Sequence, residues 1–302
     1  MGKFFIRCLM FLIGLLPLKV HYFNAKWLAW LIRKVFRYRR TDVIINLSRC
    51  FPYMQYNEIK YYEKLFYDHL AELIVEAVWF GACRNPERLR KARIVEIANP
   101  ELLAGVYAKS PSVMVLYSHT GNWELLGGIE QYNYSDKPLG LGVKDFCVVY
   151  RKLASQTWDA IFKENRYAPI RNKNGYDGYI ESRNLPRYVF RHKDEKKVYN
   201  VNTDQRPYFS APSYIECQFL GRSVKTMSAA AALAAKFGMA VLYLNMNRMQ
   251  QGRYLLEYSL ICEDASRMSA EEIMQQYYDF LSRDIINNQP NYLWTHRRFQ
   301  QI

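Results

Sequence analysis

The sequence contains no Cys-x-x-C pair and no cluster of Cys and His with the spacing of a zinc site. Its six cysteines are scattered over 302 residues, so we expect free thiols in a reducing compartment and no bound metal. The sequence has fewer acidic than basic residues, with 28 Asp and Glu against 42 Lys and Arg, so its net charge is +14. Such an excess favours partners that carry phosphate. Helix-turn-helix, zinc-finger and RNP-like motifs are missing as well, so we expect no nucleic-acid partner.

Long hydrophobic runs are also missing. Residues 4–18 are apolar, but Arg7 interrupts them and Pro17 ends them, and a spanning helix needs about 20 apolar residues. Aromatic and cationic residues alternate with apolar ones up to residue 40, a pattern typical of a segment in the lipid headgroup layer. We therefore predict a membrane-anchoring helical segment over 1–40, followed by a second domain over 41–302. The positive charge after the apolar stretch predicts that this domain lies in the cytoplasm. A cleaved signal and a buried helical hairpin are the alternatives.

The rest of the chain has the pattern of an α/β protein. A helix is predicted over 57–80 from apolar residues at helical spacing, and another begins at the capping box of Ser269 and Glu272. Short apolar runs alternate with helical stretches, at 113–118, 146–150, 198–203 and 239–247. The segment RYLLEYSLIC at 253–262 is predicted to pair antiparallel with the last run. We expect a central, mostly parallel, mixed sheet flanked by helices.

Each of the four apolar runs ends in polar residues, which are His119, Arg151, Asp204 with Gln205, and Arg248. Ligands of open α/β sheets bind outside the carboxyl ends of the strands. The sequence therefore predicts one site formed by these residues. Arg151 suits a phosphate or an oxyanion, although an ordinary salt bridge is an equal alternative. The alternative to a site role is a cap or turn residue for Asp204 and a solvated charge for Arg248.

The segment S-H-T-G-N-W-E that starts at Ser118 is the strongest candidate for chemistry. His119 can act as a general base near neutral pH, and a carboxylate that holds its ring would stabilise the imidazolium. Glu124 is one candidate for that carboxylate, or else it binds the head group of a substrate. Asn122 lies in the turn and is a candidate substrate ligand. By spacing alone, a structural histidine beside a carboxylate is the more frequent explanation of such a segment.

The chain resembles the bacterial lipid A biosynthesis acyltransferases over nearly its full length. The similar blocks follow the family's order, and they are YRRTDVIINLSRCFP, HTGNWE, VYRKL, TDQ, QFLGRSVKT, RMQQGRY and PNYLWTHRRF. Gln218, Phe219 and Leu220 depart from the family's usual double phenylalanine. The last block contains Trp294, His296, Arg297 and Arg298, which are expected either at the membrane with phosphates or in C-terminal packing.

The resemblance implies that His119 is the general base and Glu124 its acidic partner. It implies transfer of a fatty acyl group from a thioester, on acyl carrier protein or coenzyme A, to a hydroxyl of a lipid A precursor. No cofactor is needed for this chemistry. Arg151, Asp204, Gln205, Arg248 and Asn122 would bind substrate, and orienting His119 is the alternative role of Asp204. The protein would work at the bacterial inner membrane, with its catalytic domain on the cytoplasmic face.

Three other functions are compatible with the same residues. An acyltransferase of this fold would act on another membrane lipid, such as a phospholipid, aminolipid or glycolipid. A hydrolase would use His119 to activate water against a thioester. A basic membrane-binding protein without catalysis would not depend on His119 at all.

Overall fold

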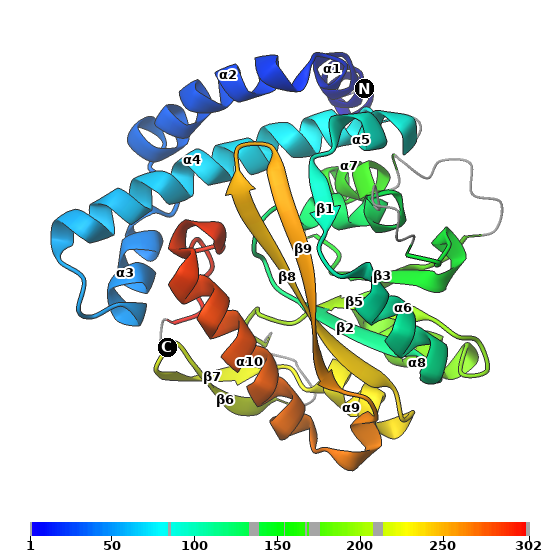
Figure 1. Ribbon diagram of the computed structural model, residues 1–302. Helices are drawn as coiled ribbons and strands as arrows, with labels where there is room; N and C mark the ends of the chain where they lie inside the picture. Colours follow the sequence, from blue (N-terminus) through cyan, green and yellow to red (C-terminus); the bar gives the residue numbers. More distant parts are fainter. Residues whose placement is uncertain are drawn as a thin grey trace.

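The computed structural model describes residues 2–83, 86–132, 139–153, 155–166, 168, 176–207 and 214–299. At its centre lies a seven-stranded sheet in the order β1-β9-β8-β2-β5-β3-β4 (Figure 1). Its strands are β1 (Val95–Ile97), β2 (Val113–Tyr117), β3 (Phe146–Tyr150), β4 (Tyr179–Glu181), β5 (Val198–Asn202), β8 (Ala240–Gln250) and β9 (Arg253–Cys262). The strands from β8 to β4 are parallel, and β9 is antiparallel to β8. The predicted mixed, mostly parallel sheet is confirmed.

Helices cover both faces of this sheet. The α-helices are α1 (Gly2–Gly14), α2 (Leu18–Trp30), α3 (Arg40–Cys50), α4 (Tyr56–Gly81), α5 (Pro86–Ala92), α6 (Pro100–Lys109), α7 (Gln156–Arg166), α8 (Leu185–Arg191), α9 (Ala229–Lys236) and α10 (Ala270–Asn287). Short helical segments are the π-helical η1 (Leu31–Val35) and the 3₁₀ segments η2 (Trp123–Gln131), η3 (Val143–Asp145), η5 (Ser182–Asn184), η6 (Ala265–Arg267) and η7 (Gln289–Asn291).

Strand β2 lies in the middle of the sheet, and all five of its side chains are buried. Met114 and Leu116 belong to one hydrophobic cluster, which includes residues of α8, α9 and α10. Val113 and Val115 belong to another, which includes residues of α5 and α6. A strand that is covered on both faces has no alternation of polar and apolar residues, which explains its continuous apolar sequence.

The long elements agree with the sequence, whereas several short ones were not predicted. The helix expected over 57–80 is α4, the capping box at Ser269 is present, and the antiparallel partner is β9. Strands β1 and β4 and the hairpin of β6 (Ile215–Phe219) and β7 (Arg222–Thr226) were missed. Leu220 and Gly221 form the hairpin turn with φ of 50° and 73°, and leucine is rare in this conformation.

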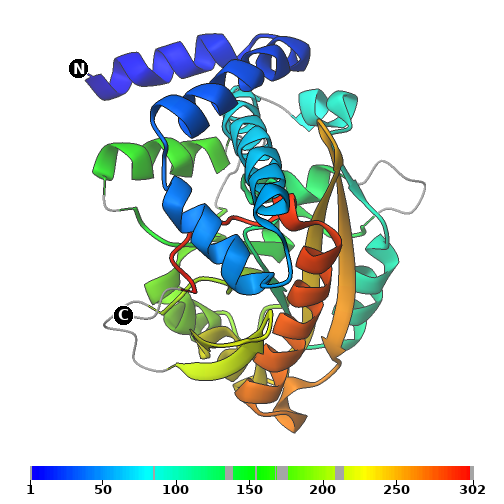
Figure 2. The same ribbon diagram turned by 90° about the vertical axis from the view of Figure 1, so that its left-hand side faces the viewer.

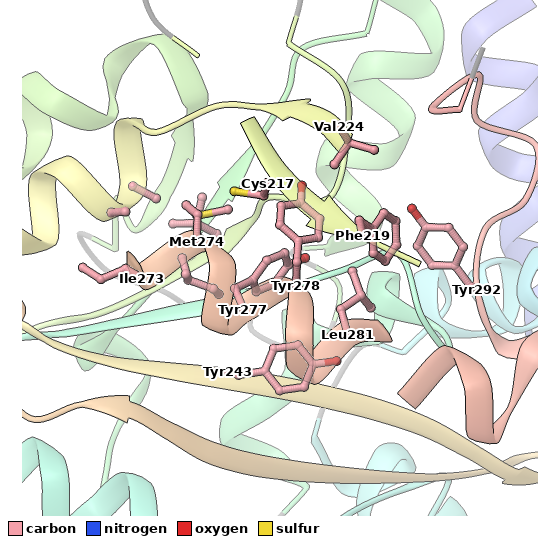
Figure 3. Packing of buried hydrophobic residues seen from close by; sticks show 14 of the residues in the cluster. Cys217, Phe219, Val224, Tyr243, Ile273, Met274, Tyr277, Tyr278, Leu281 and Tyr292 are labelled. Carbon is pink, nitrogen blue, oxygen red and sulfur yellow. The ribbon is translucent and has the colours of Figure 1, made fainter. Parts of the chain in front are cut away.

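Helix α10 packs against the β6–β7 hairpin through a group of buried aromatic side chains (Figure 3). Tyr277 donates a hydrogen bond to the backbone oxygen of Tyr117 at 3.1 Å, and Tyr278 donates one to that of Thr203 at 3.4 Å. These oxygens lie at the carboxyl ends of β2 and β5. The core therefore fixes the two strand ends from which His119 and Asp204 project.

The N-terminal helices lie at the edge of the molecule, where α2 runs along α4 and α1 crosses the C-terminal end of α4 (Figures 1 and 2). Ala25 and Ala29 of α2 pack against Ala71 and Val75 of α4, so small side chains allow the helices to approach closely. Within the described residues, none of the individual helices is long and apolar enough to cross a membrane; Phe4–Gly14 and Leu18–Val35, bent by 117°, pass that test only as a pair. The predicted anchor and the division at residue 40 stay predictions.

Candidate active site

His119 follows β2, and the C-terminal segment holds its backbone in place. The backbone N–H of Leu293 donates to the His119 oxygen at 3.0 Å, and Gly121 N–H donates to the Asn291 oxygen at 3.0 Å. Between them, Thr120 and Tyr292 form an isolated antiparallel bridge. Residues 291–293 therefore hold the turn at 119–121 against the sheet.

Gly121 is required at this turn for two reasons. Its φ is +57°, a conformation that other residues rarely adopt. A Cβ atom there would also lie 2.5 Å from the backbone oxygen of Met246 on β8. Any larger residue would push the turn away from β8 and move His119 with it.

The His119 ring is held from both sides. Nδ1 lies 2.7 Å from Oδ1 of Asp204, and Nε2 lies 3.0 Å from the amide nitrogen of Gln205. Because a carboxylate accepts hydrogen bonds, Nδ1 carries the proton and Nε2 presents its lone pair to the Gln205 amide. Trp123 contacts the ring edge-on at a centroid distance of 4.7 Å. The imidazole thus has the tautomer of a general base.

The Asp204 carboxyl is almost fully buried, at 2% exposed. Burial alone would raise its pKa, but the charge of His119, the hydrogen bonds from His119 and the charge of Arg298 hold the pKa below the usual range. The side chain is therefore an anion at neutral pH, and it favours a positive charge on His119. This is the arrangement in which a buried aspartate orients a catalytic histidine.

His119 opens into a cavity of about 410 Å³ at the carboxyl ends of β2, β3 and β5, which we call the catalytic cavity. Arg151, Gln205 and Glu124 also line it, so the structure brings these four predicted residues together. Its apolar wall comes from several elements and consists of Val148, Val149, Leu153, Leu185, Val201, Met227, Ala229, Ala230 and Leu293. The cavity combines a base, cations and an apolar wall.

Glu124 contacts an arginine instead of His119. Both of its oxygens bind Arg166 of α7, with Nε and a terminal nitrogen each at 2.9 Å. In the described part of the chain, no hydrogen bond or salt bridge joins Glu124 to His119. The contact expected from the resemblance is therefore made by Asp204, because β5 lies beside β2 in the sheet. A direct role for Glu124 in catalysis stays a prediction.

Asn122 is fully buried and does not line the catalytic cavity. It donates a hydrogen bond to Glu76 of α4 at 2.7 Å. The same carboxyl group accepts hydrogen bonds from Tyr22 of α2 at 2.9 Å and from Tyr254 of β9 at 2.8 Å. Burial raises the pKa of Glu76 to about 7. Asn122 thus joins the catalytic turn to the N-terminal helices, and the structure gives it no contact with the cavity.

Arg248 does not reach the catalytic cavity either. Its nitrogens bind Glu72 of α4 at 2.7 and 2.9 Å. Tyr117, the last residue of β2, pairs with Leu244, so Arg248 lies four residues further along β8. At about 3.3 Å per residue, this places Arg248 roughly 13 Å beyond the strand end. The prediction that four strand ends form one site is correct for three of them and wrong for Arg248.

Comparison with known families decides what kind of protein this is. The family model of the bacterial lipid A biosynthesis acyltransferases matches residues 1–166 and 189–301. The chain belongs to this family. No curated protein matches it. The family is one of acyltransferases, and residues 167–188 lie outside the match.

The blocks that resemble this family contact one another in the structure. Asn46, from the RTDVIINLSRC block on α3, donates to the backbone oxygens of Trp294 and His296 at 2.8 and 2.7 Å. Trp294 and Arg298 are 1% and 5% exposed. They pack in the interior, so C-terminal packing is the correct alternative for both. Burial lowers the pKa of His296 to about 4. The first and last blocks of this acyltransferase therefore hold the turn that carries His119.

Two charged residues of the cavity were not singled out from the sequence. Arg166 ends α7 and neutralises Glu124, and Arg206 follows Gln205 and lines the cavity. Arg206 extends the TDQ block by one residue, which was a usable signal. No sequence signal indicated Arg166, because its position depends on how α7 packs. Among the described residues, His, Cys, Asp and Glu form no group of three or more that could hold a metal ion.

Proposed function

We propose that this acyltransferase moves a fatty acyl group from a thioester to a hydroxyl of a lipid A precursor, with His119 as general base. One observation carries the proposal. His119 is bound by Asp204 at Nδ1 and directs Nε2 toward a cavity with an apolar wall and cations. That combination suits a substrate with a fatty chain and negative charge.

In the proposed reaction, the acceptor hydroxyl takes the place of the Gln205 amide at Nε2 of His119. Nε2 removes the hydroxyl proton while the oxygen attacks the thioester carbonyl carbon. An ester C–O bond forms, the C–S bond breaks, and the imidazolium returns the proton to the thiolate. The negative charge of Asp204 stabilises the imidazolium between these steps.

The remaining residues of the catalytic cavity form two groups, cations that would bind negative charge and apolar residues that would bind the fatty chains. Arg151 and Arg206 line the cavity and would bind phosphate or the developing oxyanion. The charge of Arg166 is already balanced by Glu124. The fatty chains would contact the apolar wall of valine, leucine and methionine side chains. We propose acyl carrier protein as the donor's carrier, with coenzyme A as the alternative, and no further cofactor.

Attachment to the bacterial inner membrane is part of the proposal. Large apolar side chains are exposed on the N-terminal helices, including Phe4 at 75%, Phe23 at 64% and Trp27 at 63%. Exposed apolar groups in such density indicate a surface that binds a membrane or another protein. Cationic residues beside them favour an anionic lipid surface. We propose that these helices rest on the cytoplasmic leaflet.

The test is mass spectrometry of lipid A from the source bacterium after deletion of the gene. The gene is then restored as wild type, as His119→Ala, or as His192→Ala, whose histidine binds Glu195 at the surface. We expect one acyl chain to be lost and to return with wild type and His192→Ala only. Unchanged lipid A would reject this acceptor and direct the search to total lipid extracts. Thiol release that does not depend on any lipid would indicate a hydrolase.

A further inference from the structure

A second cavity, of about 720 Å³, lies between α2, η1, α4 and the β8–β9 hairpin, and we call it the basic cavity. Residues from all four elements line it, among them Ala25, Lys26, Ala29, Lys34, His69 and Arg248. His119 and Asp204 do not line it. It is therefore a separate site from the catalytic cavity.

Small residues leave this space open. Ala25 and Ala29 are only 3% and 4% exposed, and they lie on the side of α2 that faces α4. Their methyl groups bring the two helices together but do not fill the volume beside the contact. Larger residues at these positions would close the cavity.

The lining carries a surplus of positive charge. Three of its cations are balanced by carboxylates at 2.6–2.8 Å, namely Arg33 by Glu63, Lys64 by Asp68 and Arg248 by Glu72. Lys26 and Lys34 line the same cavity, and within the described ranges neither forms a salt bridge. An anion entering the cavity would meet two cations that need not first break an ion pair.

His69 gives an independent indication of a ligand. It is 3% exposed and lines the basic cavity, and neither ring nitrogen makes a well-formed hydrogen bond among the described residues, although the backbone of Gly121 lies close to the ring. Nδ1 lies 3.9 Å from the Glu72 carboxylate, which is beyond hydrogen-bond distance. Burial lowers the pKa of His69, so the neutral ring offers one N–H donor. Buried polar groups are normally satisfied, and a bound ligand would satisfy this one.

The surroundings indicate where that ligand comes from. Trp30 lines the cavity and is 52% exposed, and Trp27 beside it is 63% exposed. Tryptophan is enriched at the level of lipid head groups, where lysines bind anionic lipids. A phosphate at this level belongs to a membrane lipid.

We propose that the basic cavity binds the phosphate head group of an anionic membrane lipid, with Lys26, Lys34 and a His69 N–H as its donors. The lipid would hold α2 against α4 at the membrane surface. This site goes beyond acyl transfer and does not depend on it, because it needs neither the acceptor nor the donor.

The test is native mass spectrometry of the full chain in a neutral maltoside, titrated with phosphatidylglycerol or phosphatidylcholine. The variants are Lys26→Ala with Lys34→Ala, and His69→Phe, which keeps a ring and removes both nitrogens. Lys109→Ala on α6 is the matched control, because it removes an exposed lysine far from the cavity. Circular dichroism checks that each variant is folded. If His69→Phe does not fold, the double lysine variant still tests the proposal, because Lys26 and Lys34 are exposed.

We expect phosphatidylglycerol to bind more tightly than phosphatidylcholine. Its affinity should fall about tenfold or more in both cavity variants, since each removes hydrogen bonds to a charged group. It should not change in Lys109→Ala. Equal binding of the two lipids, or equal losses in the double variant and Lys109→Ala, would overturn the proposal. Displacement of the lipid by an equal concentration of inorganic phosphate would overturn the lipid as the ligand.

Discussion

His119 and His69 each line a cavity, but their ring nitrogens differ in what they contact. The His119 ring is bound at Nδ1 by a buried carboxylate and at Nε2 by an amide. The His69 ring makes no well-formed hydrogen bond within the described residues. A carboxylate on one nitrogen fixes the tautomer and stabilises the imidazolium when it forms, whereas burial alone keeps a histidine neutral. The comparison shows that the hydrogen-bond partner, rather than burial, distinguishes the two rings.

The strongest test of this comparison is removal of the base. His119→Ala should lower turnover about a thousandfold or more, because no other side chain among the described residues that line the catalytic cavity has a basic ring nitrogen. Release of free thiol from an acyl thioester, with lipid acceptor present, measures it. His192→Ala should retain normal turnover. A His119→Ala enzyme with normal turnover would reject the mechanism.

The next test separates the two carboxylates. Asp204→Asn should lower kcat about a hundredfold to a thousandfold, because an amide does not stabilise the imidazolium. Glu124→Gln should lower it less, since Glu124 binds Arg166. Steady-state kinetics measures which of the two variants loses more kcat, and circular dichroism checks that both are folded. A larger loss in Glu124→Gln would return the role of acidic partner to Glu124.

Glu76 connects the N-terminal helices to the catalytic turn, and it should make stability depend on pH. Its pKa is raised from 4.5 to about 7 in the folded chain. Between these values the unfolded chain has lost a proton that the folded chain keeps, so stability falls as pH rises, by about 1.4 kcal/mol per pH unit. Above pH 7 the loss is complete.

Thermal unfolding in one detergent from pH 4.5 to 8 measures this effect. The Tm of Glu76→Gln should fall less over this range than that of the wild type. Glu96→Gln, which removes an exposed carboxylate on β1, should behave like the wild type. Parallel curves for Glu76→Gln and the wild type would contradict the raised pKa.

The smallest expected effect concerns Arg151. Arg151→Ala should lower kcat/KM about tenfold, the loss typical of one hydrogen bond to a charged group. Arg248→Ala is the informative comparison, because Arg248 lies in the basic cavity and binds Glu72. An equal loss in the two variants, with both folded, would mean that Arg151 has no special position in the catalytic cavity.

Long, regular elements were predictable because their signals are local. The apolar runs of β2, β3, β5 and β8 and the capping box of α10 each lie within a few residues. The three-residue strands β1 and β4 carry too few residues for a period to be visible. The β6–β7 turn uses Leu220 at a positive φ, which contradicts the usual preference for glycine or asparagine.

By itself, the sequence determined the α/β class and the family and predicted the role of His119, because these depend on apolar runs and on residue blocks in a fixed order. Only the tertiary structure decided which carboxylate binds that histidine. Asp204 is 85 residues from His119 but directly follows the neighbouring strand β5, whereas Glu124, five residues away, turns toward Arg166. Distance along the chain does not determine which side chains meet across a parallel sheet, because strand order does.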